Sequence, residues 1–214
     1  MNIFKVIKNK LFIKYNPWVR DNIINPINRK RLKNHDITLL SNNCNGACIL
    51  HDLGLKFNSP FVNLWLYPKD FIKYCGNIKY YMSKELTFID KWEGLDYPVG
   101  LLDDIKIYFQ HYHSEEEAKK KWEERTKRMN LSNLFVLLTD RDGCTKDDMH
   151  NLNNLKINHV AILVHKPLPH IPNTYYIKGF ENGTQCGILS EWAMIKYPGR
   201  KCYDDFNYVK WLNR

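Results

Sequence analysis

The chain has 214 residues, of which 44% are hydrophobic and 14% aromatic, and a formal net charge of +9. A chain of this length and apolar content can bury a full core, which excludes disorder for most of it. No uncharged apolar run reaches the roughly 18 residues of a spanning helix, and no secretory cleavage site follows the N-terminus, so we expect a cytoplasmic protein. Six scattered cysteines do not suggest a disulfide framework, and we expect reduced thiols.

The positive charge is concentrated at the N-terminal end. Residues 1–33 contain nine of the 32 Lys and Arg residues and one of the 23 acidic residues, which leaves 23 basic and 22 acidic side chains in residues 34–214. Apolar side chains recur there at steps of three and four, a pattern that predicts a basic amphipathic helix. The predicted apolar face consists of Phe4, Ile7, Leu11, Tyr15 and Trp18.

Such an arm suits an anionic membrane surface, so we expect residues 1–33 to hold the protein at the inner face of the cell membrane. An ordinary helix packed on the domain, with its lysines solvated, is an equally supported interpretation. Nucleic acid is a weaker candidate, because residues 34–214 carry no basic surplus and no recognisable nucleic-acid motif. We therefore expect no nucleic-acid partner.

Residues 34–214 are expected to form a single α/β domain, with a mainly parallel sheet and flanking helices in three layers. Strands are predicted at residues 37–40, 61–67, 99–102, 105–109, 134–138, 159–165 and 175–180, and helices at 47–53, 69–74, 115–129 and 146–155. Ser114 and Thr145 are expected to cap the last two helices. Strand, helix and strand over residues 134–164 form a βαβ unit, which requires a parallel pair and a right-handed crossover.

Ligands of open α/β sheets bind beyond the carboxyl ends of the strands, so the polar turns there are candidate sites. The first turn collects amide and hydroxyl groups at a predicted helix N-terminus, which can bind phosphate or sugar hydroxyls. Its candidate substrate-binding residues are Ser41, Asn42, Asn43, Asn45 and, on the following helix, His51. Cys44 in this turn can have a lowered pKa and act with His51 as a nucleophile, whereas the alternative is a buried structural thiol.

The second turn, Asp140-Arg141-Asp142-Gly143, follows the most apolar predicted strand. Asp140 and Asp142 are candidate ligands for Mg²⁺ or Mn²⁺, as in nucleotide-sugar glycosyltransferases, and Arg141 is a candidate substrate-binding residue. A strand-to-helix turn selects the same residue types without any metal. The turn is also similar to that of haloacid-dehalogenase phosphatases, in which the first Asp is a nucleophile, but it has an extra residue before Thr145.

Two further residues are candidate general bases. His165 ends a buried strand before a proline-containing loop, and imidazole is the usual base near neutral pH. Asp103 follows another predicted strand and offers a carboxylate. Together with Asp142 these are the candidate catalytic residues, although each also fits a plain strand-end or turn position. Dispersed tryptophans such as Trp65 can stack on sugar rings, but aromatic residues so spread out more often form core.

Much of the chain, from about residue 35 to 200, resembles the uncharacterised-domain family numbered 1919, whose members are often labelled exopolysaccharide biosynthesis proteins. The resemblance is carried by Ser41-Asn42-Asn43-Cys44, His51-Asp52-Leu53-Gly54, Tyr67-Pro68-Lys69-Asp70-Phe71, Tyr97-Pro98-Val99-Gly100, His111-Tyr112 and Thr139-Asp140-Arg141-Asp142-Gly143. It implies an α/β fold and a place in surface-glycan assembly, and it assigns no catalytic residue.

These observations favour a transferase of surface-polysaccharide assembly that acts on a glycan or a lipid-linked sugar precursor, with a nucleotide sugar as one possible donor. Residues 34–214 are short for a standard glycosyltransferase with separate donor and acceptor regions. The alternatives are a non-catalytic glycan-binding or scaffold partner and a small hydrolase or phosphatase.

Overall fold

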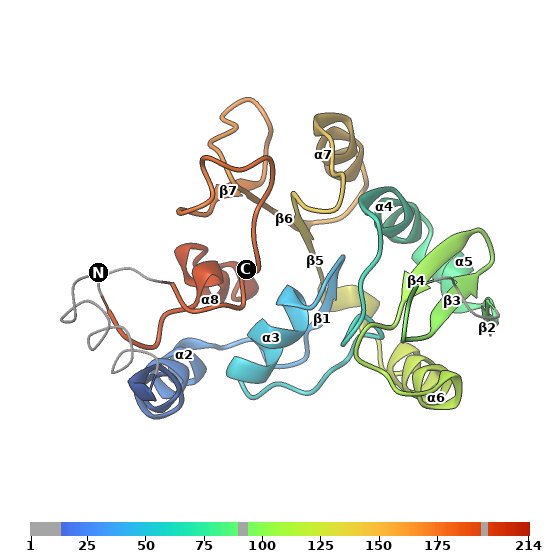
Figure 1. Ribbon diagram of the computed structural model, residues 1–214, viewed down its shortest axis with the longest axis horizontal. Coiled ribbons are helices and arrows are strands. Elements are labelled where there is room, and N and C mark those ends of the chain that lie inside the picture. Colours follow the sequence, from blue (N-terminus) through green and yellow to red (C-terminus); the bar gives the residue numbers. More distant parts are fainter. Residues whose placement is uncertain (1–13, 90–93, 194–196) are drawn as a thin grey trace.

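A parallel sheet of four strands forms the centre of the fold (Figure 1). The computed structural model describes residues 14–89, 94–193 and 197–214. The strands run in the order β1 (Thr38–Ser41), β5 (Leu134–Thr139), β6 (His159–Val164) and β7 (Thr174–Tyr176), all parallel to their neighbours. The expected βαβ unit is confirmed, because α7 (Lys146–Asn153) connects β5 to β6.

Both faces of this sheet are buried, which explains the uninterrupted apolar run of β5. Val136 and Leu138 face one core cluster, whereas Phe135 and Leu137 face a second cluster on the other side. Helices α4 (Pro68–Gly76) and α7 contribute to the first cluster. Helices α3 (Asn45–Asp52) and α8 (Tyr208–Leu212) contribute to the second. The chain is therefore a mixed α/β protein with helices on both faces of its main sheet.

A small antiparallel sheet lies to one side of the parallel one (Figure 1); the sequence pattern predicts two of its strands, at residues 99–102 and 105–109, but not the sheet as a separate unit. It contains β2 (Leu86–Phe88), β3 (Val99–Leu102) and β4 (Ile105–Tyr108) in that order. The remaining helices are α2 (Asn25–Arg31), α5 (Ile78–Met82) and α6 (Glu115–Thr126), with 3-10 turns η2 (Leu131–Asn133) and η3 (Cys202–Asp205) and a π-helical turn η1 (Arg20–Ile24).

The predicted helix caps are present. The Ser114 hydroxyl accepts from the Glu117 amide at the start of α6, and Thr145 forms a capping box with Asp148 at the start of α7. The strand predicted at residues 61–67 is wrong, because only Trp65 makes a β-bridge, to Tyr108. Its alternating apolar side chains are buried in the first cluster without a continuous backbone ladder.

The N-terminal segment packs on the domain from residue 14 onward, as far as it is described. Residues 14–19 are helical and continue through η1 into α2. Arg20 lies 2% exposed and donates to Asp52 of α3 over 2.6 Å and to Asp204 of η3 over 2.5 Å. Phe4, Ile7 and Leu11 of the predicted apolar face lie outside the described residues, so the structure does not test that part of the arm.

Residues 199–204 approach this segment very closely. Gly199 has φ +78°, and a Cβ there would lie 2.8 Å from Val19 Cγ1 and 2.9 Å from the Arg20 amide nitrogen. The Gly199 carbonyl accepts a hydrogen bond from Arg20, and its amide donates to the Asn16 side chain. Glycine is therefore required here both by its conformation and by the space.

Replacing Arg20 with Met is expected to destabilise the protein by about 3–5 kcal/mol, because Asp52 and Asp204 would lose the partner of their charges in a buried setting. Chemical denaturation monitored by circular dichroism measures the change. Lys30→Met, at an exposed position of α2, is the matched control and is expected to change stability by less than about 0.5 kcal/mol. Equal stability of the two variants would contradict a structural role for Arg20.

The same network predicts a pH dependence. Burial acts to raise the pKa of Asp52, but the Tyr203 hydrogen bond and the charges of Arg20 and Lys201 outweigh it and leave that pKa below its ordinary value of 3.8. Asp52 therefore stabilises the fold above about pH 4, and this contribution is lost as the pH falls through the lowered value. Denaturation midpoints at several pH values should show this loss in the native chain, whereas Asp52→Asn should lack that component.

Candidate functional site

A pocket of about 500 Å³ lies beyond the carboxyl ends of β1 and β5, where the sheet topology places ligands. Three parts of the chain form its walls: the turns after β1 and β5, loops flanking the antiparallel sheet, and the segment around residue 188. The lining residues are Asn43, Cys44, Asn45, Trp65, Tyr97, Gln110, His111, Arg141, Asp142, Ile188 and Ser190.

The turn after β1 divides into structural and pocket-facing residues. Asn42 is fully buried, and its Oδ1 accepts from the Thr139 amide over 3.0 Å, while Asn45 Nδ2 donates to the Thr139 hydroxyl over 3.2 Å. These bonds join the ends of β1 and β5. Ser41 is also fully buried behind the pocket. Of the four predicted residues in this turn, Asn43 and Asn45 line the pocket.

The first turn of α3 is held tightly against β1. A Cβ at Gly46 would lie 2.7 Å from the Ser41 Cβ, so only glycine allows this approach. Asn43 Oδ1 accepts from the Asn45 amide, whereas Asn43 Nδ2 is buried and has no hydrogen-bond partner among the described residues. The pocket wall thus combines a helix N-terminus with an amide donor that lacks a protein acceptor.

Three consecutive residues of the turn after β5 form hydrogen bonds to the segment at residues 185–187. Asp140 Oδ1 accepts from the Cys186 amide over 2.8 Å, Arg141 Nη1 donates to the Gly187 carbonyl over 3.1 Å, and the Asp142 amide donates to Gln185 over 2.9 Å. The chain continues from these bonds to Ile188 and Ser190 in the pocket wall. The sequence predicts Arg141 and Asp142 as site residues, and both line the pocket.

Asp140 and His165 form a buried pair next to this turn. His165 Nδ1 lies 2.5 Å from Asp140 Oδ2, and the His165 amide donates to the same oxygen over 2.8 Å. The His165 side chain is 18% exposed and is not among the residues that line the pocket. Asp140 therefore orients this imidazole and joins the ends of β5 and β6 to Cys186, and both its oxygens are engaged.

This engagement bears on two of the expectations for the acidic turn. Asp140 is 4% exposed, does not line the pocket and accepts hydrogen bonds at both oxygens, so the geometry does not support the similarity to haloacid-dehalogenase phosphatases. Asp142 lines the pocket whereas Asp140 does not, and no group of three or more His, Cys, Asp or Glu side chains in the described part of the chain is placed to hold a metal. A site for Mg²⁺ or Mn²⁺ on these two carboxylates stays a prediction.

The structure also gives the position or the ionisation of three other candidate residues. Burial and the neighbouring Cys48 raise the pKa of the Cys44 thiol to about 11, so it is protonated at neutral pH rather than activated. His51 is 78% exposed near the opposite end of α3 from the pocket. Asp103 sits at the tip of the β3–β4 hairpin and accepts from Tyr80, whereas Tyr97 and Gln110 at the open end of that hairpin line the pocket.

Other residues complete the pocket wall, and of these the sequence offers only Trp65, as a ring-stacking candidate. Trp65 is half-buried and stacks on Tyr108, with ring centroids 4.1 Å apart and an angle of 11° between the planes. His111 is exposed in the pocket and is held by the bond from its amide to the Asn63 carbonyl. Tyr97, Gln110 and Ser190 complete this wall. Trp65 and Tyr67, separated by one residue, were the available sequence signal for a ring-stacking surface.

A second pocket, of about 470 Å³, lies between α2 and the C-terminal elements η3 and α8. Its charged residues are largely paired with one another: Arg200 bonds to Asp205 over 2.9 Å, and Asp204 bonds to Arg20. Three of its four charged lining residues, all except Arg31, therefore form ion pairs within the protein, which makes the pocket at the strand ends the stronger candidate.

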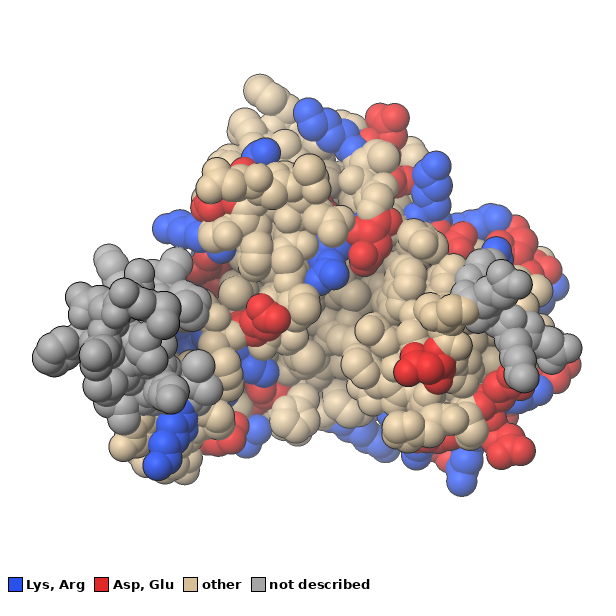
Figure 2. All heavy atoms as spheres, in the orientation of Figure 1, with Lys and Arg blue, Asp and Glu red and all other residues tan. Residues whose placement is uncertain are grey.

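All six cysteines are free thiols. In the described ranges, no helix combines the length and apolar character needed to cross a bilayer. Acidic and basic side chains are interspersed over the visible face of the body, and the centre of that face is mostly uncharged (Figure 2).

Comparison with known proteins places the chain in a family. It is 48% identical over 190 residues to a protein of Haemophilus influenzae (strain ATCC 51907 / DSM 11121 / KW20 / Rd) described as "Uncharacterized protein", which covers 89% of this chain and 90% of that relative. The model of the family described as "Domain of unknown function (DUF1919)" matches residues 15–213, so most of the predicted arm lies inside the family's domain. The chain belongs to the DUF1919 family.

Proposed function

We propose that this protein is a transferase of surface-polysaccharide assembly whose pocket at the ends of β1 and β5 binds a phosphorylated sugar, with a nucleotide sugar as the preferred class of donor. The observation that carries the proposal is the meeting of anion-binding groups and an aromatic ring in one pocket. Arg141 and the N-terminus of α3 lie on one side, and Trp65 and Tyr97 lie on the other.

The two walls suit the two halves of such a ligand. A guanidinium and free backbone amides at a helix N-terminus favour phosphate oxygens. The unpartnered Asn43 Nδ2 adds a donor that a ligand oxygen can satisfy after a small rotation of the side chain. The Trp65 ring, backed by Tyr108, offers a flat apolar face for a sugar or a base.

Two titratable groups in the pocket supply acid–base chemistry. His111 is exposed in the wall, and an imidazole there can accept a proton from an acceptor hydroxyl. Asp142 lies 4.0 Å from the Arg141 Nε. If the donor diphosphate carries a divalent cation, Asp142 is the acidic residue among the described lining residues that would bind it. The other oxygen ligands would come from the donor.

We further propose that the acceptor is a glycan or a lipid-linked sugar precursor, which would place the enzyme at the cytoplasmic face of the membrane. The pocket wall includes the exposed side chain of His111, and an exposed group in the wall suits contact with an acceptor larger than the donor.

A non-catalytic glycan-binding protein is the second candidate. It is favoured because both Asp140 oxygens accept hydrogen bonds from the protein and the Cys44 thiol is protonated, which leaves few reactive groups around the pocket.

Nucleotide sugars are expected to stabilise the native protein against heat. A ligand at about 100 times its dissociation constant adds about 2.7 kcal/mol to the free energy of unfolding. Thermal unfolding with a panel of nucleotide sugars and nucleotides, each with and without Mg²⁺ or Mn²⁺, measures this shift. Trp65→Ala and Arg141→Met should abolish it, because one removes the stacking surface and the other the guanidinium.

Matched controls come from predicted residues that the structure places outside the pocket. His51→Ala and Asp103→Asn are expected to keep the full ligand-induced shift. If no compound of the panel stabilises the native chain while its fold is intact, the nucleotide-sugar proposal is wrong.

His111→Gln is expected to separate catalysis from binding. With a donor identified in the panel, the variant should keep the thermal shift but release nucleotide about 10²–10⁴-fold more slowly, as for the loss of a general base. Nucleotide release is followed by a coupled enzymatic assay. His165→Gln is the comparison. If only this variant releases nucleotide more slowly, the general base is His165 of the Asp140–His165 pair and not His111. Binding without release in the native chain would favour the glycan-binding candidate.

A further inference from the structure

The N-terminal segment at residues 15–27 has its polarity reversed relative to an ordinary surface helix. Its buried side chains are polar: Asn16, Arg20 and Asn25 are 4%, 2% and 1% exposed. Its outward side chains include four large apolar ones, and this outward apolar face consists of Tyr15, Trp18, Ile23 and Ile27, which are 53%, 57%, 43% and 53% exposed. A surface helix normally buries its apolar residues and exposes its polar ones.

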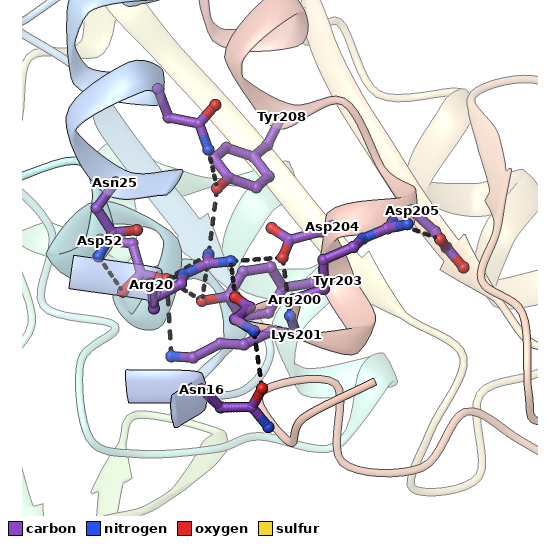
Figure 3. Close-up of polar contacts among 12 residues, drawn as sticks. Asn16, Arg20, Asn25, Asp52, Arg200, Lys201, Tyr203, Asp204, Asp205 and Tyr208 are labelled. Atoms are coloured by element: carbon purple, nitrogen blue, oxygen red, sulfur yellow. Dashed lines mark hydrogen bonds and ion pairs between the residues drawn. The ribbon is translucent and has the colours of Figure 1, made fainter. Parts of the chain in front are cut away.

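The reversal has a physical cause in the interior of the protein. Figure 3 shows Asn16, Arg20 and Asn25 directed toward Asp52 and the segment at residues 199–208. Arg20 alone donates to Asp52, Asp204 and the hydroxyls of Tyr203 and Tyr208. Because the polar side is needed for this network, the opposite side of the segment must face outward.

The π-helical turn η1 keeps the buried polar residues on one side of the segment and the exposed apolar residues on the other. The steps from Arg20 to Asn25 and from Trp18 to Ile23 are both five residues long, which matches the i→i+5 bonding of a π-helix. The helix then resumes as α2 and brings Ile27 onto the side of Ile23. The apolar residues therefore form one continuous face rather than four scattered exposures.

Exposed basic side chains flank this face along the sequence. Lys14, Lys30, Arg31 and Lys33 are exposed within or directly beside the segment. The single acid in residues 14–33 is Asp21, which accepts a hydrogen bond from Asn25. A face of this kind fits a surface that is negatively charged outside and apolar underneath.

We propose that the outward apolar face docks on an anionic lipid bilayer, with Trp18 and Tyr15 at the headgroup level and Ile23 and Ile27 inserted below it. Trp and Tyr are enriched at membrane–water interfaces, and amphipathic helices with basic flanks bind there. A protein partner fits less well, because protein interfaces are depleted of lysine. The proposal does not rest on the function of the pocket.

The test uses the full chain and flotation with vesicles of equal parts phosphatidylglycerol and phosphatidylcholine, or of phosphatidylcholine alone. The native chain should bind the anionic vesicles, and the triple variant Trp18→Ala, Ile23→Ser, Ile27→Ser should lose at least about tenfold in partitioning. Lys30→Glu with Arg31→Glu should weaken binding by at least about fivefold for each charge. Residues 1–13 are unchanged in every variant.

Two controls make the result specific. Tyr80→Ser removes an exposed aromatic ring from α5, at the other side of the protein, and should bind like the native chain. Trp18→Phe should keep binding but lose the part of the tryptophan fluorescence that brominated lipids quench. Thermal unfolding of each variant verifies that the fold is retained, which is expected because the replaced side chains are exposed.

Three outcomes would overturn the proposal: no binding of the native chain to anionic vesicles, equal binding by the triple variant, or unchanged quenching in Trp18→Phe. Sedimentation covers the remaining alternative. If the native chain is a dimer and the triple variant a monomer, the face joins two copies of the chain and does not serve as a membrane surface.

Discussion

The buried guanidinium of Arg20 is the constraint on which much of the structure depends. Removing a charge from water is costly unless its partners are close and well oriented, and here they come from two parts of the chain that are distant from Arg20 in sequence. Asp52 ends α3, Asp204 lies in η3, and Tyr203 donates to the same carboxylate of Asp52 that Arg20 contacts. Because each partner is needed to offset the cost of the buried charge, the N-terminal segment, α3 and the C-terminal elements have to assemble together.

The effect of this network extends to the pocket through α3. Asp52 at the end of α3 is fixed by Arg20, and the first turn of the same helix is fixed against β1 at Gly46 and to β5 by Asn45. A helix of eight residues is about 12 Å long, so the two anchored ends are separated by one rigid element. The donors that face the pocket are thus positioned from both ends of α3, which is the kind of preorganisation that an anion site requires.

Local signals predicted much of this fold, whereas long-range pairing defined the rest. The caps at Ser114 and Thr145 and the apolar runs of β5 and β6 are encoded within a few residues, and they were predictable for that reason. The strands β3 and β4 were predicted, but the turn between them at Asp103-Asp104 lacks the Asn-Gly or Asp-Gly pair that marks hairpins, so their antiparallel pairing had no clear local signal. In the site, Arg141 and Asp142 follow a strand and could be found, but Trp65 and His111 reach the pocket only through tertiary packing. Arg20 shows the limit most clearly, because a basic residue in a basic segment is expected in solvent and its partner Asp204 lies 184 residues away.

The reversed polarity of the N-terminal segment is a consequence of the same buried charge. A helix has two sides, and once the Arg20 side faces Asp52 and Asp204, the side with Trp18 and Ile23 faces outward, and these two side chains are 57% and 43% exposed. Replacing the outward residues with polar ones would cost the fold little, since exposed positions contribute little to stability. Their presence is therefore better explained by an external apolar surface than by folding. The proposed bilayer would supply that surface on the outer side of the segment that anchors the Asp52 end of α3, whereas the pocket lies at the other end of that helix.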